Sequence, residues 1–210
     1  MKQIVFLDAG HSLTDPGTVS IYAKESDLNI KIRDCLTPEL QRNGFEVKAV
    51  PDNLNLADSI TWVNERSKQI EDGLALAVHN NCCGGSGPET YYYGNSESSK
   101  KIAWQLLKGY CEEMGIPFEE KRVRSDTTGR WGELGWIRKT EPWATLIECF
   151  YIDNKENVEY GKNNILKIAQ GIASGACRIY GIPYLKETSQ PEIKTKEQLK
   201  AEAKRIIDLL

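Results

Sequence analysis

The stretch Ile4-Val5-Phe6-Leu7-Asp8-Ala9-Gly10-His11-Ser12 decides how the rest of the chain is interpreted. Its run of apolar residues predicts a buried strand. Gly10 gives the backbone the freedom to turn sharply where that strand ends. His11, the first of only two histidines in the chain, follows on this turn. A histidine there is a candidate functional residue, because ligands of open α/β sheets bind at the carboxyl ends of the strands.

Two further apolar runs are followed by ionisable side chains at the same relative place. Residues 74–78 precede His79, which a turn-prone pair of asparagines follows, and residues 144–147 precede Glu148. We expect these side chains to converge with His11 at one edge of a sheet. Two imidazoles together with carboxylates are what a zinc hydrolase needs, so the pattern indicates a metal-dependent hydrolase.

The composition is that of an ordinary globular protein with one core, because 40% of the 210 residues are hydrophobic and 27% are charged. A net charge of −3 argues against nucleic-acid binding, which favours a basic surface. No run approaches the roughly 20 apolar residues of a membrane span, so we expect no membrane insertion. The apolar run near the N-terminus is too short for a signal peptide. The sequence therefore predicts a protein made in the cytoplasm that acts outside the membrane only after release, and it gives no indication of the oligomeric state.

The six cysteines show no CxxC spacing, and some lie in apolar surroundings. This distribution predicts free, buried thiols of a reduced compartment. Cys82 and Cys83 follow His79 closely enough to contact a metal there. Adjacent cysteines rarely chelate one ion, so a metal contact is not the favoured interpretation of this pair, and its role stays open at the level of sequence.

Strands alternate with helices along residues 1–183, which predicts one α/β domain. Its sheet should be twisted, mainly parallel or mixed, and flanked by helices. Further strands are expected over 45–50 and 89–93, helices over 26–43, 56–70, 98–114 and 155–180, and a strand with an irregular excursion over 117–142. Residues 184–210 are predicted to form a linker and a C-terminal amphipathic helix. That helix either docks on the domain or begins another module.

Two carboxylates near the histidines differ in what surrounds them. Glu25 opens the first predicted helix, where favourable interaction with the helix dipole is sufficient to explain it. Glu148 lies inside an apolar strand, and an isolated buried charge costs several kcal/mol, so it needs a partner. A metal-bound water is one suitable partner for this carboxylate.

Four motifs, in this order, resemble the zinc-dependent N-acetylmuramoyl-L-alanine amidases of the type-3 class, which includes phage endolysins and bacterial autolysins. They are Asp-Ala-Gly-His at 8–11, a glutamate ahead of Leu-Asn at 25–29, His-Asn-Asn at 79–81, and Glu-Cys-Phe-Tyr-Ile-Asp-Asn at 148–154. The resemblance extends from Ile4 to Cys177. Two positions depart from the family pattern, because Ser12 and Cys149 stand where the family usually has glycine or another small residue.

The resemblance implies that His11, Glu25 and His79 bind one Zn²⁺ and that Glu148 acts as general base and general acid. A zinc ion lowers the pKa of its bound water toward ~7, and a carboxylate then transfers the proton to the leaving amine. The implied substrate is peptidoglycan, cut at the amide bond between N-acetylmuramic acid and L-alanine. Candidate substrate-binding residues are Asn81, Glu89, Tyr91, Tyr93, Arg130, Trp131 and Trp136, although aromatic residues also serve edge-strand and loop packing.

Two alternatives to this function remain at the level of sequence. The ligand set alone also permits a zinc peptidase that cleaves another stem-peptide bond, such as a carboxypeptidase. A non-catalytic wall-binding module could keep the fold, but Glu148 in an otherwise apolar strand argues against it. The favoured hypothesis is an endolysin-like amidase that acts on the cell wall after release.

Overall fold

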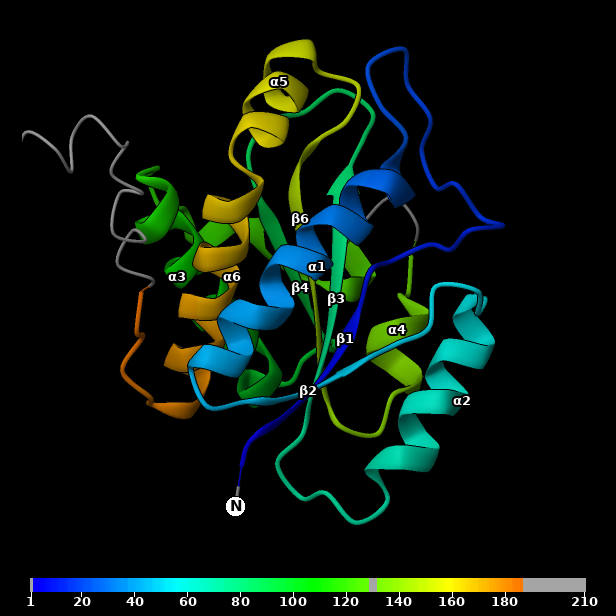
Figure 1. Cartoon of the computed structure of the whole chain (residues 1–210), viewed down its shortest axis with the longest axis vertical. Coiled ribbons are helices and arrows are strands. Elements are labelled where there is room, and N and C mark those ends of the chain that lie inside the picture. The colour runs from blue at the N-terminus through cyan, green and yellow to red at the C-terminus, as the bar shows by residue number, and fades with distance from the viewer. Residues whose placement is uncertain (1, 129–131, 187–210) are drawn as a thin grey trace, which may run out of the picture.

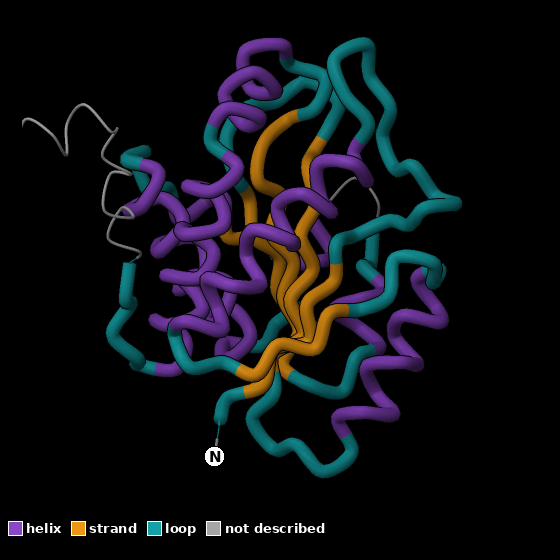
Figure 2. Tube along the Cα trace, viewed as in Figure 1, coloured by secondary structure: helices purple, strands orange, loops and turns teal. Residues whose placement is uncertain are grey.

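The structure, a computed structural model, describes residues 2–128 and 132–186. Its centre is a six-stranded sheet in the order β2-β1-β3-β6-β4-β5, drawn in Figures 1 and 2. The strands are β1 (Ile4–Asp8), β2 (Glu46–Ala49), β3 (Leu74–Asn81), β4 (Glu89–Tyr92), β5 (Val123–Ser125) and β6 (Trp143–Tyr151). Strands β2, β1, β3 and β6 run parallel to one another. Strand β4 pairs antiparallel with β6, and β5 pairs parallel with β4. The expected α/β fold with a mixed sheet is confirmed.

Helices cover both faces of the sheet. One face packs against α1 (Glu25–Arg42), α3 (Glu97–Met114) and α6 (Ile165–Tyr180), and the other against α2 (Leu56–Ser67) and α4 (Gly135–Lys139), as Figure 1 shows. Successive strand side chains point to opposite faces, so Leu76 and Val78 join the core under α1 while Ala75 and Ala77 join the core under α2. The same alternation points His79 toward the face of α2 and α4.

One predicted strand end is placed differently by the structure. Strand β3 does not end before the asparagine pair but continues through His79 to Asn81. The cause is pairing with β6, which places His79 opposite Glu148 and outweighs the local turn tendency of the asparagines. Glu148 lies within β6, as the apolar residues on both sides of it predict. His79 and Glu148 therefore lie opposite each other on paired strands, and the register of the two strands shifts directly after His79.

The predicted helix over 155–180 is two helices, α5 (Lys155–Asn163) and α6. Asn164 separates them with a non-helical backbone at φ −125°, and its side-chain amide donates to the Tyr160 carbonyl at 2.8 Å. Asparagine offers the backbone this local alternative to a helical hydrogen bond. The helix predicted over 56–70 ends at Ser67, whereas α1 continues past Pro38 to Arg42.

The prediction of free thiols is wrong for Cys82 and Cys83, which are joined in a vicinal disulfide. Asp153 accepts hydrogen bonds from the Cys83 and Gly84 backbone N–H groups and holds this segment where β3 has ended. The other four cysteines are free, as expected: Cys35, Cys111, Cys149 and Cys177.

The start of the predicted linker packs on the domain. The Leu185 backbone N–H donates to Asn43 Oδ1 at 2.6 Å, beyond the end of α1. The amphipathic helix predicted over 195–210 lies outside the described residues. Within the described ranges, no helix has both the length and the apolar character needed to cross a membrane.

Candidate metal centre

A tight loop after β1 presents the first histidine. Asp8 Oδ2 accepts the Gly10 N–H at 2.8 Å, and both Gly10 (φ +52°) and His11 (φ +61°) adopt left-handed backbone conformations. Histidine is among the residues that tolerate this region. A Cβ on Gly10 would lie 2.4 Å from His79 Nε2, so glycine leaves room for the second imidazole. Ser12, where the family usually has glycine, accepts the Asp15 N–H at 3.0 Å and stabilises the same loop.

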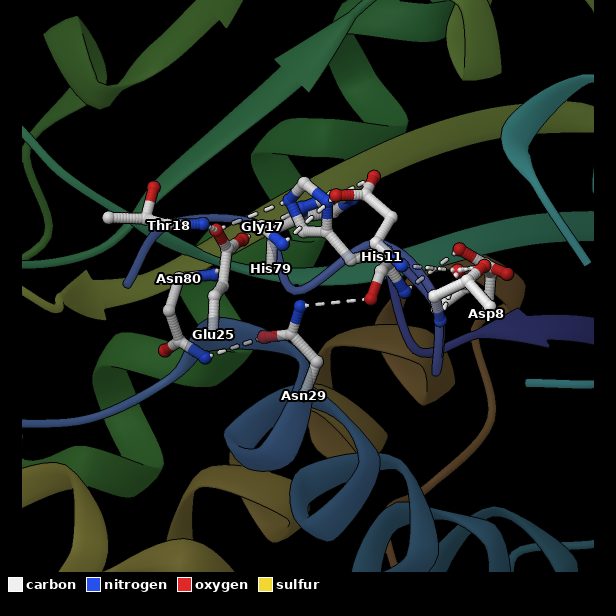
Figure 3. Close-up of polar contacts among 12 residues, drawn as sticks. Asp8, His11, Gly17, Thr18, Glu25, Asn29, His79 and Asn80 are labelled. Atoms are coloured by element: carbon white, nitrogen blue, oxygen red, sulfur yellow. Dashed lines mark hydrogen bonds and ion pairs between the residues drawn. The ribbon is translucent and has the colours of Figure 1, made fainter. Parts of the chain in front are cut away.

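Glu25, the first residue of α1, contacts both imidazoles with its carboxylate (Figure 3). Its Oε2 is 3.2 Å from His11 Nε2, and its Oε1 is 3.1 Å from His79 Nδ1. Backbone N–H groups of Thr18 and Asn80 also donate to the carboxylate, at 2.9 and 3.3 Å. One ligand atom from each of the three side chains lies within 4.8 Å of the other two. Interaction with the helix dipole alone is therefore not the role of Glu25.

The donor set fits a metal of the zinc type. Two imidazole nitrogens and one carboxylate oxygen are a known protein ligand set of catalytic zinc, which keeps a further position open. Gly17 also leaves the space that the donors need, since its Cβ would lie 2.5 Å from His11 Cδ2 and 2.7 Å from Glu25 Oε2. Asp15 Oδ2 lies 3.0 Å from His11 Nδ1 and orients that ring, as carboxylates do behind metal-bound histidines.

Two buried asparagines connect the segments that carry the three donors. The Asn29 side-chain amide donates to the Gly10 carbonyl at 3.2 Å, and the Asn80 amide donates to Asn29 Oδ1 at 2.7 Å (Figure 3). Their side chains thus join the His11 loop, α1 and β3. Our sequence interpretation gave neither residue a role. The available signals were the position of Asn29 four residues after Glu25, on the same helix face, and the position of Asn80 next to His79.

Glu148 is an acid whose protonation is poised near neutrality. It lies between His79 of β3 and Glu89 of β4 in the register of the sheet. Burial raises the pKa of Glu148 to about 7, and the charges of Glu25 and Glu89 act in the same direction against the lowering effect of His79. Among the described residues its buried Oε2 has no hydrogen-bond partner. A buried polar atom without a partner is unfavourable, so this oxygen is suited to a reacting group in the site.

The carboxylates control the protonation of the histidines. Burial lowers the pKa of His11, but hydrogen bonds and charge from Glu25 and Asp15 outweigh burial and raise it to about 9. The pKa of His79 is raised in the same way, with burial opposed mainly by Glu25 and Glu148. Burial acts to raise the pKa of Glu25, yet contacts with both histidines hold it below its usual range. Because a metal ligates neutral imidazole, protons compete with a metal for this site.

The predicted substrate-binding residues of β3 and β4 form one network beside Glu148. The Glu89 carboxylate accepts hydrogen bonds from the Tyr91 hydroxyl at 2.8 Å and the Asn81 amide at 3.2 Å. Arg124, which the sequence interpretation missed within its polar stretch, pairs with Glu89 at 3.1 Å. The Tyr151 hydroxyl donates a longer hydrogen bond to the Glu89 carboxylate, at 3.4 Å.

The remaining candidates are divided in space. Trp136 is buried and its indole N–H donates to the Ala75 carbonyl at 3.3 Å, yet it also lines a cavity of about 190 Å³ beside His11 and His79. Tyr93 lies just beyond β4, where the Arg138 guanidinium covers its ring. Arg130 and Trp131 lie outside the described residues.

The sheet, the three donors and the Glu148 carboxylate beside them together have the features of a metal-dependent hydrolase of the α/β class. Residues 5–178 match the family of N-acetylmuramoyl-L-alanine amidases. The chain belongs to this family, which hydrolyses peptidoglycan and is generally zinc-dependent. The family resemblance, the enzyme class and the peptidoglycan-hydrolase function expected from the sequence are thereby confirmed.

Individual relatives agree with this family. The chain is 27% identical over 209 residues to an endolysin of Bacillus phage SPP1, covering 93% of this chain and 73% of the relative. It is 25% identical over 184 residues to the N-acetylmuramoyl-L-alanine amidase CwlM of Bacillus licheniformis, covering 85% and 69%. The catalytic domain of the amidase CwlV from Bacillus (Paenibacillus) polymyxa var. colistinus has the same fold, with a TM-score of 0.70, 24% identity, and coverage of 86% of this chain and 99% of that domain.

Proposed function

We propose that His11, Glu25 and His79 hold one Zn²⁺ and that Glu148 transfers the proton during cleavage of the amide bond between N-acetylmuramic acid and L-alanine. The observation that carries this proposal is the set of three donors within 4.8 Å of one another, beside a buried carboxylate whose Oε2 has no described partner. When bound, the ion supplies Lewis-acid polarisation of the amide carbonyl and activation of the attacking water.

The residues of this chain would perform the proton transfers. Glu148 accepts a proton from the attacking water and passes it to the departing amide nitrogen, which leaves as the α-amino group of L-alanine. A pKa of about 7 suits both steps, because the carboxyl group loses and regains a proton readily at neutral pH. Asp15, Asn29 and Asn80 keep the donor side chains oriented.

Substrate contacts are assigned to the network around Glu89. Asn81, Glu89 and Tyr91 lie on the strands next to Glu148, and the polar groups there suit the hydroxyl and amide groups of a muramoyl peptide. Arg130 and Trp131 remain candidates for substrate contact on sequence grounds. The catalytic domain is assigned to residues 1–183, with 184–210 as an extension.

The biological role that fits is lysis of the cell wall after release from the cell that makes the protein. Support comes from the endolysin relative and from the family match. The net charge of −3 favours neither nucleic acid nor a strongly acidic partner. The family match favours the muramoyl amide over the stem-peptide bonds that the ligand set alone would permit.

Two variants of the full chain test the residue roles. Glu148→Gln should lower kcat on peptidoglycan by about 10²- to 10⁴-fold and still bind one zinc ion per chain. His79→Ala should lose both zinc and activity. Zinc content by elemental analysis and release of new amino termini are the two readouts. Full activity in Glu148→Gln, or full zinc content in His79→Ala, would reject the assigned role.

A further inference from the structure

A second cavity, of about 810 Å³, lies away from the metal centre. It is formed where α3 and α6, which pack side by side (Figure 1), meet the start of β6, and α4 and Tyr93 beyond β4 also line it. Trp143 of its wall is the first residue of β6, five positions before Glu148. At ~3.3 Å per residue the two lie roughly 17 Å apart along the strand, and their odd spacing points them to opposite faces of the sheet. The Trp143 side of the cavity is therefore distant from Glu148, although Tyr93, one of the predicted substrate-binding residues, also lines the cavity.

An aromatic pair forms one wall of this cavity. Trp143 is 42% exposed and stacks on Tyr180, with ring centroids 6.0 Å apart and an interplanar angle of 27°. The Tyr180 hydroxyl donates to the Asp72 backbone carbonyl at 2.7 Å, which fixes the orientation of the Tyr180 ring. A rigid, exposed indole face suits a ligand with a flat apolar face, such as the C–H face of a sugar ring.

Hydrogen-bond donors contribute to the other walls, beside apolar residues such as Ile102 and Ile179. Arg178 is held by Gln105 at 3.1 Å and by Glu112 at 2.9 Å, and Lys101 and Ser98 also line the space. The described lining residues include several cationic side chains but no aspartate or glutamate. These walls favour a ligand that is rich in acceptor oxygens and either neutral or anionic. An apolar face combined with many acceptors is the chemistry of a saccharide.

We propose that this cavity is a second binding site for the glycan strand of peptidoglycan, where a sugar ring lies on Trp143 and its oxygens accept from Arg178 and Lys101. The proposal rests on the proposed function, because the polymer that the enzyme cuts supplies the ligand. Many copies of the same disaccharide lie along one strand, so a second contact raises the effective concentration of substrate at the metal centre. Acetamido and hydroxyl groups provide the required acceptors, and the lactyl group adds a carboxylate wherever the stem peptide has been removed.

Binding of peptide-free glycan strands tests the site without any cleavage, because these strands lack the scissile amide. The zinc-loaded full chain should bind them, and Trp143→Ala should weaken binding roughly 2- to 10-fold. Lys101→Glu, an exposed change with little effect on folding, should weaken binding as well. Tyr160→Ala is the matched control, since Tyr160 is a 46% exposed aromatic residue on α5 outside the cavity. Its binding should equal that of the unmodified chain.

Hydrolysis measurements separate this proposal from the proposed function. All three variants should cleave a short soluble muramoyl peptide as fast as the unmodified chain, whereas the two cavity variants should digest intact walls more slowly. No binding of strands by the unmodified chain, or equal binding by both cavity variants, would overturn the second site. A dimer that Trp143→Ala abolishes, without glycan binding, would assign the cavity to a second copy and also overturn it. Failure of every protein on the soluble substrate would instead count against the proposed function.

Discussion

Gly17→Ala should impair zinc binding through a steric effect that can be calculated from the structure. The new Cβ would lie 2.5 Å from His11 Cδ2 and 2.7 Å from Glu25 Oε2, and real Cβ contacts essentially never fall below 3.0 Å. The His11 ring must therefore retreat by about 0.5 Å and the Glu25 carboxylate by about 0.3 Å. Metal–ligand distances are held within about 0.2 Å, so both donors would leave their positions.

The expected loss of zinc affinity is about 10- to 100-fold, the range seen when the groups that orient metal ligands are removed. Gly44→Ala is the matched control. Gly44 also has a positive φ, +89°, but a Cβ there would meet no atom within 4 Å. Both variants should lose about 1–2 kcal/mol of stability from the left-handed backbone, so only the loss of zinc affinity distinguishes them.

Chelator competition against the metal-free proteins measures zinc affinity, and thermal unfolding measures the shared backbone effect. Gly44→Ala should bind zinc as tightly as the unmodified chain while it unfolds at a lower temperature. If Gly17→Ala binds zinc as tightly as Gly44→Ala, the donors are not packed as the structure has them, and the metal assignment loses its geometric basis.

Three further predictions concern protonation and the support of the donors. Because interactions with Glu25 and Asp15 raise the pKa of His11 from 6.5 to about 9, the metal-free fold should have this stabilisation in full below pH 6.5 and lose it as the pH rises through 9. Zinc affinity should change in the opposite direction and rise about tenfold per pH unit between pH 6.5 and 9, because binding displaces one proton from His11. An affinity that chelator competition finds independent of pH would contradict the raised pKa of His11. Glu89→Gln removes a charge that helps raise the pKa of Glu148, so the acid limb of the kcat/KM profile should move to lower pH, and an unchanged limb would show that Glu89 has no electrostatic role. Asn29→Leu should weaken zinc binding about tenfold, whereas Asn29→Asp should retain more of the affinity. Equal zinc binding by the two variants and the unmodified chain would show that the Asn29 hydrogen bonds to Gly10 and Asn80 do not support the metal donors.

Much of the fold followed from local patterns. Short apolar runs before His11, His79 and Glu148 predicted the three strands of the site, because buried parallel strands need apolar side chains on both faces. The proximity of the histidines followed from the rule for carboxyl ends of strands. The role of Glu25 required the family resemblance, since a carboxylate in a first helical turn has an ordinary electrostatic explanation.

The structure departs from the predictions made from sequence where tertiary contacts outweigh local tendencies. The pairing of β3 with β6 extends a strand through residues that favour turns, and Asn164 divides a helix whose apolar periodicity continues on both sides. Arg124 lies in a polar stretch and becomes informative only when β5 pairs with β4 and brings it to Glu89. Cys82 and Cys83 carry no spacing signal, so sequence gave no reason to pair them.

One measurement tests the central claim most directly. Purified peptidoglycan is digested by the full chain, by the chain stripped with a strong chelator, and by the stripped chain supplied with one equivalent of Zn²⁺, and new amino termini are then identified. We predict new alanine amino termini, lost with the chelator and restored by zinc, with no new reducing sugar ends. Amino termini on another residue would contradict the assigned bond, and digestion unaffected by the chelator would contradict the metal centre of His11, Glu25 and His79.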